Sequence, residues 1–81
     1  MRVVSGTRSE GVASARRLLR TFASAPDARR RAHEIFQALA RIDGLTQAER
    51  AAVAELGAWL AQKPSSTQLK PRCETLLAAF R

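Results

Sequence analysis

The sequence is poor in the residue types from which most catalytic and metal sites are built. It contains one cysteine, one histidine, one tryptophan and no tyrosine. The single cysteine, Cys73, excludes an intramolecular disulfide, and no second cysteine or histidine lies at the spacing of a zinc site. Paired carboxylates and a glycine-rich phosphate loop are also missing. We therefore expect no enzymatic activity, no cofactor and no bound metal.

Long apolar runs are missing as well. No stretch approaches the length of a membrane span, and residues 1–11 contain no apolar segment of signal-peptide length. Together with the isolated cysteine, this predicts a cytoplasmic protein that does not associate with membranes. We expect residues 1–7 to form an N-terminal segment that is either flexible or ordered by a partner, and in a complex Val3 and Val4 can add one short strand.

Positive charge and apolar residues are plentiful. The 81 residues are 46% hydrophobic and 26% charged, which is typical of one folded domain. Fourteen Lys and Arg residues against seven Asp and Glu give a formal net charge of +7, which favours an acidic protein surface or nucleic acid as the partner. Lys63 and Lys70 are the only lysines. Because abundant Arg and Ala are also typical of G+C-rich bacterial or phage genomes, the charge reflects either function or codon usage.

Helix-start patterns recur along the chain. A hydroxyl residue is followed three positions later by an acid in TRSE from Thr7, SAPD from Ser24 and TQAE from Thr46, and SSTQ from Ser65 is a weaker version. In such a pattern the hydroxyl accepts a hydrogen bond from a free backbone amide, while the acid reaches back to the first residue. Each of these sites therefore predicts the start of a helix.

Apolar residues spaced three and four apart extend from each of these starts. They predict helices over residues 9–23, 25–42, 47–62 and 67–80, each with one apolar stripe. Pro71 complicates the last helix, which is either irregular around the proline or begins only there, with residues 65–70 as a loop. Trp59 and Cys73 lie on apolar stripes, and we expect both in the core. The fold class is therefore all-α, a small bundle of four short helices in a single domain.

The first predicted helix carries a cluster of basic residues. Arg16, Arg17 and Arg20 fall within about 100° of arc on one side of this helix, next to its apolar stripe. Such a basic ridge can bind an acidic partner or contact phosphates without reading a base sequence. The alternative is an ordinary solvated face.

Three consecutive arginines, Arg29, Arg30 and Arg31, lie near the start of the second predicted helix. Because each residue of a helix turns about 100° from the last, their side chains must point to three different sides, and Arg30 can pair with Glu34. The simple interpretation is a set of solvated side chains whose aliphatic parts cover the edge of the core. The alternative is a phosphate or carboxylate site, since an anion would offset the unfavourable interaction of these cations with the helix dipole.

The third predicted helix has a face of small residues opposite its apolar stripe, formed by Ala51, Ala54, Gly57, Ala58 and Ala61. Small side chains let another helix approach closely, although alanine is also the best helix former. We expect this face to be buried inside the bundle. The alternative is contact with a partner or with a second copy of the chain, which would form a homodimer.

Residues 45–57, LTQAERAAVAELG, resemble the opening helix of a helix-turn-helix motif. Pro64 disfavours this interpretation, because it falls where the second helix of such a motif should be in full course.

Taken together, these patterns indicate a small basic protein that acts by docking on another macromolecule. The leading hypothesis is an adaptor, inhibitor or regulator that binds an acidic protein surface and is encoded by a phage or a mobile element. The alternative is a nucleic-acid-binding regulatory protein that contacts phosphates through the arginine ridge. This alternative lacks an aromatic platform on which bases could stack.

Overall fold

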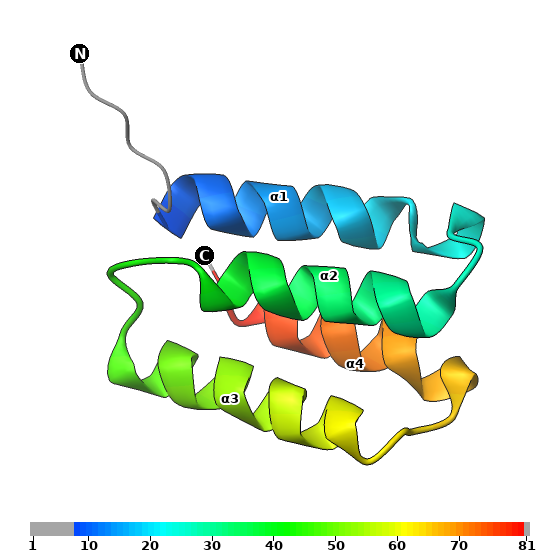
Figure 1. Cartoon of the computed structure of the whole chain (residues 1–81). Coiled ribbons are helices and arrows are strands. Elements are labelled where there is room, and N and C mark those ends of the chain that lie inside the picture. The colour runs from blue at the N-terminus through cyan, green and yellow to red at the C-terminus, as the bar shows by residue number, and fades with distance from the viewer. Residues whose placement is uncertain (1–7, 81) are drawn as a thin grey trace.

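Four α-helices and one short 3-10 helix make up residues 8–80, the part of the chain that the computed structural model describes (Figure 1). They are α1 (Arg8–Arg20), η1 (Phe22–Ser24), α2 (Ala28–Ala40), α3 (Gln47–Ala61) and α4 (Ser66–Ala78). No strand occurs within this range. The all-α bundle of four short helices expected from the sequence is therefore confirmed. The predictions for Val3, Val4, Thr7 and the N-terminal segment lie outside the described residues.

The start of α3 has the predicted capping box. The hydroxyl of Thr46 accepts a hydrogen bond from the backbone N–H of Glu49 at 3.0 Å, and the backbone N–H of Thr46 donates to the Glu49 carboxylate at 3.1 Å. Ser65 is the N-cap residue of α4 as expected, but its hydroxyl makes no capping bond and lies 2.8 Å from the hydroxyl of Thr67. Of these two patterns, only TQAE, which contains the acid, forms a full cap.

The prediction that Ser24 caps the second helix is wrong. Ser24 belongs to η1, and the N-cap of α2 is Asp27, whose carboxylate accepts from the backbone N–H groups of Arg29 and Arg30 at 3.1 and 3.2 Å. Pro26 gives the physical reason, because a proline disfavours helical backbone at the residue before it, and Ala25 is indeed extended. The first helix therefore ends before this proline, and the second begins after it.

The last helix continues through Pro71, so the alternative that it begins only at the proline is wrong. It starts at Ser66, and Leu69, one half-turn before Pro71, is fully buried. The burial of Leu69 beside Cys73 stabilises the helical turn that precedes the proline and offsets the backbone hydrogen bond that the proline cannot make.

The core is organised around α2. This helix lies between α1 and α3, and α4 packs behind it and against α1 (Figure 1). The buried apolar side chains are Val12, Ala15, Phe22, Ala32, Ile35, Leu39, Ile42, Leu45, Val53, Leu56, Leu60, Leu69, Cys73, Leu76, Leu77 and Phe80. Cys73 is in the core as predicted. Trp59 is half-buried at its edge, where the guanidinium of Arg72 lies 5.2 Å from the centre of the indole.

The prediction that the small-residue face of α3 is buried inside the bundle is wrong. Ala51, Ala54, Ala58 and Ala61 are all exposed. Because α4 packs on α1 and α2, α3 lies at the edge of the bundle and packs mainly against α2. Gly57 is the exception on this face, since it is half-buried against the ring of Phe36.

The helix-turn-helix interpretation is also wrong. A turn would have to follow Gly57, but α3 runs without interruption from Gln47 to Ala61. None of the helices within residues 8–80 combines the length and the apolar character needed to cross a lipid bilayer.

Candidate interaction surface on α1 and α4

Arg16, Arg17 and Arg20 are exposed on α1, and we call these three residues the basic ridge. None of the three forms an ion pair with a residue in the range 8–80. Arg16 donates a hydrogen bond to the backbone carbonyl of Phe80 at 2.6 Å, and Arg17 donates to the hydroxyl of Ser14 at 3.3 Å. Their guanidinium groups therefore keep most of their donors for a partner, and Arg16 is held in place by the end of α4.

A groove between α1 and α4 runs along one side of the basic ridge. Its lining consists of Arg16, Leu19, Arg20, Lys70 and Glu74. Lys70 lies 3.9 Å from the carboxylate of Glu74, and both side chains are about half exposed. This groove thus joins two ridge residues to a third cation that comes from a different helix.

A second groove lies along the exposed side of α1. It is lined by Arg8, Ser9, Val12, Ala13 and the three residues of the basic ridge. None of these residues is acidic, and the lining of the α1–α4 groove includes one acid against three cations. Two unit charges of opposite sign that lie 4 Å apart attract each other by about 1 kcal/mol in water, and by more where the pair is partly desolvated. Both grooves therefore favour an anionic ligand.

Sequence reasoning missed Lys70, Leu19 and Arg8 as neighbours of the basic ridge. The helical period places Leu19 beside the ridge, which is a signal that the sequence does contain. Lys70 could not be found in this way, because it approaches the ridge only when α4 packs against α1.

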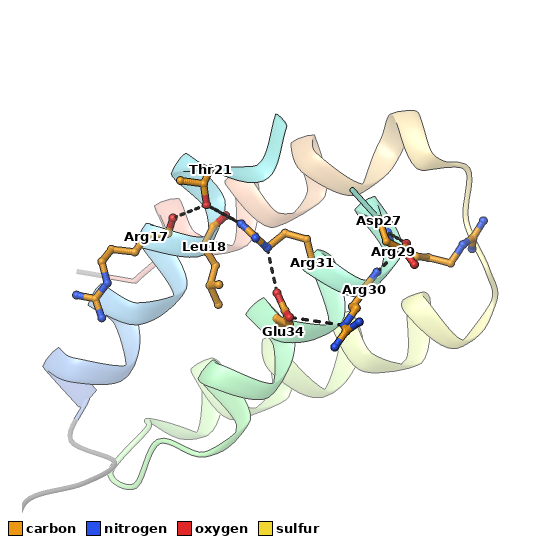
Figure 2. Close-up of polar contacts among 8 residues, drawn as sticks. All are labelled: Arg17, Leu18, Thr21, Asp27, Arg29, Arg30, Arg31 and Glu34. Atoms are coloured by element: carbon orange, nitrogen blue, oxygen red, sulfur yellow. Dashed lines mark hydrogen bonds and ion pairs between the residues drawn. The ribbon is translucent and has the colours of Figure 1, made fainter. Parts of the chain in front are cut away.

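The three consecutive arginines are spread apart, as the helical turn predicts (Figure 2). Arg31 reaches back to the end of α1, where it donates to the backbone carbonyl of Leu18 at 3.0 Å and to the hydroxyl of Thr21 at 2.6 Å. It also donates to Glu34 at 3.0 Å, and its side chain is only 19% exposed. Arg30 lies 3.9 Å from Glu34, as expected, and Arg29 points away from the other two into solvent.

Arg31 therefore connects two helices. The carbonyl of Leu18 lies in the last turn of α1, where backbone carbonyls have no partner within the helix, so a cation at this position is favourable. The amides of Arg29 and Arg30 at the start of α2 are in turn hydrogen-bonded to Asp27. Asp27 therefore already provides, at the start of α2, the negative charge that an anion bound near Arg29, Arg30 and Arg31 would supply.

A second charged link joins α1 to α3. Both Arg8 Nε and Arg8 Nη2 donate to the carboxylate of Glu49, and the Nε to Oε1 distance is 3.3 Å. The hydrogen bond from Arg8, followed by that from the backbone of Thr46, lowers the pKa of Glu49 to about 2. The same hydrogen bond raises the pKa of Arg8. The Arg8 guanidinium also lies 5.8 Å from the centre of the Phe80 ring, so it links the start of α1 to α3 and to the residues that follow α4.

The groups that could carry nucleophilic or metal chemistry do not form a site. Burial raises the pKa of the Cys73 thiol to about 11, so this thiol is neutral at physiological pH. His33 is exposed. Within residues 8–80 no three His, Cys, Asp or Glu side chains lie close enough together to hold a metal ion.

The exposed alanine face of α3 lies beside an apolar groove between α2 and α3. This groove is lined by Phe36, Ala40, Ile42, Leu45, Arg50, Val53 and Ala54. No side chain within residues 8–80 covers the alanines. Contact of this face with a partner or with a second copy stays a prediction.

The chain matches no protein-family model, no curated protein and no solved structure. We therefore take the function from the geometry of the described residues.

Proposed function

We propose that this protein is a non-enzymatic helical binding protein that docks on the acidic surface of another protein through the basic ridge and acts as an adaptor, inhibitor or regulator. The observation that carries the proposal is the cluster of three exposed arginines on α1, which have no acidic partner within residues 8–80 and lie between two grooves.

The distribution of acids supports a binding role for the basic ridge. Two acids elsewhere pair with arginines, since Glu49 pairs with Arg8 and Glu34 pairs with both Arg30 and Arg31. None of the three ridge arginines takes part in these pairs. A guanidinium group offers a planar fork of donors that fits a carboxylate with two parallel hydrogen bonds, so three of them suit a surface rich in Asp and Glu.

The order of Arg16 also supports the proposal. Its hydrogen bond to the Phe80 carbonyl holds the long side chain in one position before a partner arrives. A side chain that is already ordered loses less conformational entropy on binding, typically by about 0.5–1.5 kcal/mol.

The nucleic-acid alternative uses the same ridge to contact phosphates. It is less well supported, because single-stranded nucleic acid needs exposed aromatic side chains for stacking. Within residues 8–80, Phe22 and Phe80 are buried, Phe36 is half-buried, and Arg72 lies over the half-buried Trp59. Contact with the phosphates of a duplex does not need such stacking, so it is the form of this alternative that duplex binding tests.

The test compares two variants with the same change in charge. The ridge variant is Arg16→Glu, Arg17→Glu and Arg20→Glu, and the control is Arg29→Glu, Arg41→Glu and Arg50→Glu, whose wild-type side chains are also exposed. Each is used to capture partners from a lysate of the native host, with quantification by mass spectrometry. We expect the ridge variant to lose its main protein partner by at least about tenfold and the control to retain it, because only the ridge forms one cluster. Thermal melting followed by circular dichroism checks that both variants fold.

Two results would overturn the proposal. One is a protein partner that binds the ridge variant and the wild type equally. The other is high affinity for duplex DNA or RNA at about 50 mM salt that falls steeply as salt is raised and is lost in the ridge variant, since this salt dependence is typical of phosphate contacts.

A further inference from the structure

The α1–α4 groove differs from a purely cationic surface because its lining includes an apolar side chain, Leu19. Leu19 is only half-buried, so part of its side chain is open to the groove. Arg16 and Arg20 from α1 and Lys70 from α4 line the same groove. A free phosphate or a nucleic-acid backbone can use these cations, but it gains nothing from the exposed carbon atoms of Leu19.

The groove also contains Glu74, whose carboxylate lies 3.9 Å from Lys70. The Glu74 carboxylate in the groove repels a densely charged polyphosphate. A peptide tolerates it, because the backbone N–H groups of a peptide can donate to a carboxylate. One apolar side chain, three cations and one acceptor in the same groove together match a peptide chain that alternates acidic and apolar side chains.

We propose that this groove binds an acidic segment of the partner protein that carries an apolar side chain between its carboxylates. The apolar side chain packs on Leu19, and the carboxylates pair with Arg16, Arg20 and Lys70. This inference rests on the proposed function, and it adds the chemical class of the partner segment and two residues, Leu19 and Lys70, that are not part of the basic ridge.

The probes are two fluorescein-labelled synthetic peptides of about twelve residues that carry mostly Asp and Glu. One has a leucine at its centre, and the other has serine there. Binding is measured by fluorescence anisotropy at about 50 mM salt, where the attraction between charges is only weakly screened. We expect the leucine peptide to bind about five- to tenfold more tightly than the serine peptide, the difference that burial of most of one leucine side chain produces.

Variants of the protein locate the site. Leu19→Ala should remove most of the difference between the two peptides, whereas Leu18→Ala should keep it, because Leu18 is also half-buried on α1 but does not line the groove. Lys70→Glu should weaken both peptides by about fivefold or more, and Lys63→Glu, with the same change in charge, should not. Lys70 is exposed, and the one ion pair that it forms within residues 8–80 is with Glu74, so this variant keeps the test valid if a leucine variant unfolds.

The outcomes separate this inference from the proposed function. Equal binding of the two peptides, with loss of both in the ridge variant, would contradict the apolar contact and leave the proposed docking on acidic proteins intact. A preference for leucine that survives both Leu19→Ala and Lys70→Glu would place the peptide outside this groove and overturn the inference. Binding of both peptides that is unchanged in the ridge variant would overturn the inference and the proposed function together.

Discussion

The carboxylate of Glu49 links the start of α3 to the start of α1. It accepts from the backbone of Thr46 at 3.1 Å and from both Nε and Nη2 of Arg8. All of these hydrogen bonds favour the charged form, and they lower its pKa from 4.5 to about 2. Because the pKa is lower in the folded state than in the unfolded state, ionisation of Glu49 contributes to stability above about pH 4.5, and this contribution is lost as the pH falls toward 2.

The effect of Glu49 can be measured by urea unfolding between pH 5 and pH 2. In this window the free energy of unfolding of the wild type should fall more steeply than that of Glu49→Gln, which has no carboxylate to protonate at this position. Glu55→Gln is the matched control, because Glu55 is exposed on the same helix and should leave the slope unchanged. Equal slopes in all three proteins would contradict the lowered pKa of Glu49 in the folded state.

Lys63 is the one described residue other than glycine with a positive φ, at 57°. It follows Gln62, the C-cap of α3, and occupies the position that glycine usually takes at the end of a helix. A side chain in this left-handed conformation costs about 1–2 kcal/mol, part of which glycine regains.

Lys63→Gly should therefore stabilise the protein by about 0.5–1 kcal/mol in urea unfolding. Lys63→Ala is the control, because alanine keeps the Cβ atom that causes the strain and should bring no such gain. If the glycine variant is less stable than the wild type, then the positive φ at this position is not a source of strain.

At the scale of the element, the contact between α1 and α2 depends on the absence of a side chain at Gly11. A Cβ atom there would lie 2.5 Å from Ile42 Cδ1, well inside contact distance, and Ile42 is 5% exposed. Gly11 therefore has a packing role in the interior of a helix, where glycine is otherwise unfavourable by about 1 kcal/mol relative to alanine.

Two opposing effects decide the outcome of Gly11→Ala. Overpacking costs about 1–3 kcal/mol and the gain in helix propensity is about 1 kcal/mol, so we expect a net loss of about 1 kcal/mol in the free energy of unfolding. In an Ile42→Ala background the space is open, and the same substitution should then stabilise by up to about 1 kcal/mol. A change of the same sign in both backgrounds, measured by thermal unfolding, would rule out the proposed contact.

The elements show which local features a sequence reveals. The capping box of Thr46 and Glu49 was predictable, because both halves of the contact lie within one turn. The capping pattern at Ser24 predicts a start of the second helix that is too early, because Pro26 keeps Ala25 extended and the helix begins only after Asp27. The exposed alanines of α3 could not be interpreted from the pattern, because alanine is common both in close helix contacts and on solvated helices.

At the scale of the whole molecule, four apolar stripes were sufficient to predict a bundle of four helices. They did not reveal that α2 would be central or that α3 would lie at the edge, because every stripe can pack against every other. For the candidate site, too, the pattern within one helix was predictable and the packing between helices was not. The basic ridge was predictable from the helical period of α1. The presence of Lys70 in the same groove, and the hydrogen bond from Arg31 to the Leu18 carbonyl, depend on how the helices pack against one another.

The contact between Arg8 and Phe80 brings the two ends of the described chain together, with the start of α1 beside the end of α4. The backbone thus follows a nearly closed path. A circularly permuted chain, in which a short linker joins these ends and the break is moved to the surface loop at residues 63–65, would retain all four helices and their neighbours. The four helices would then pack in the same way although they follow one another in a different order along the chain.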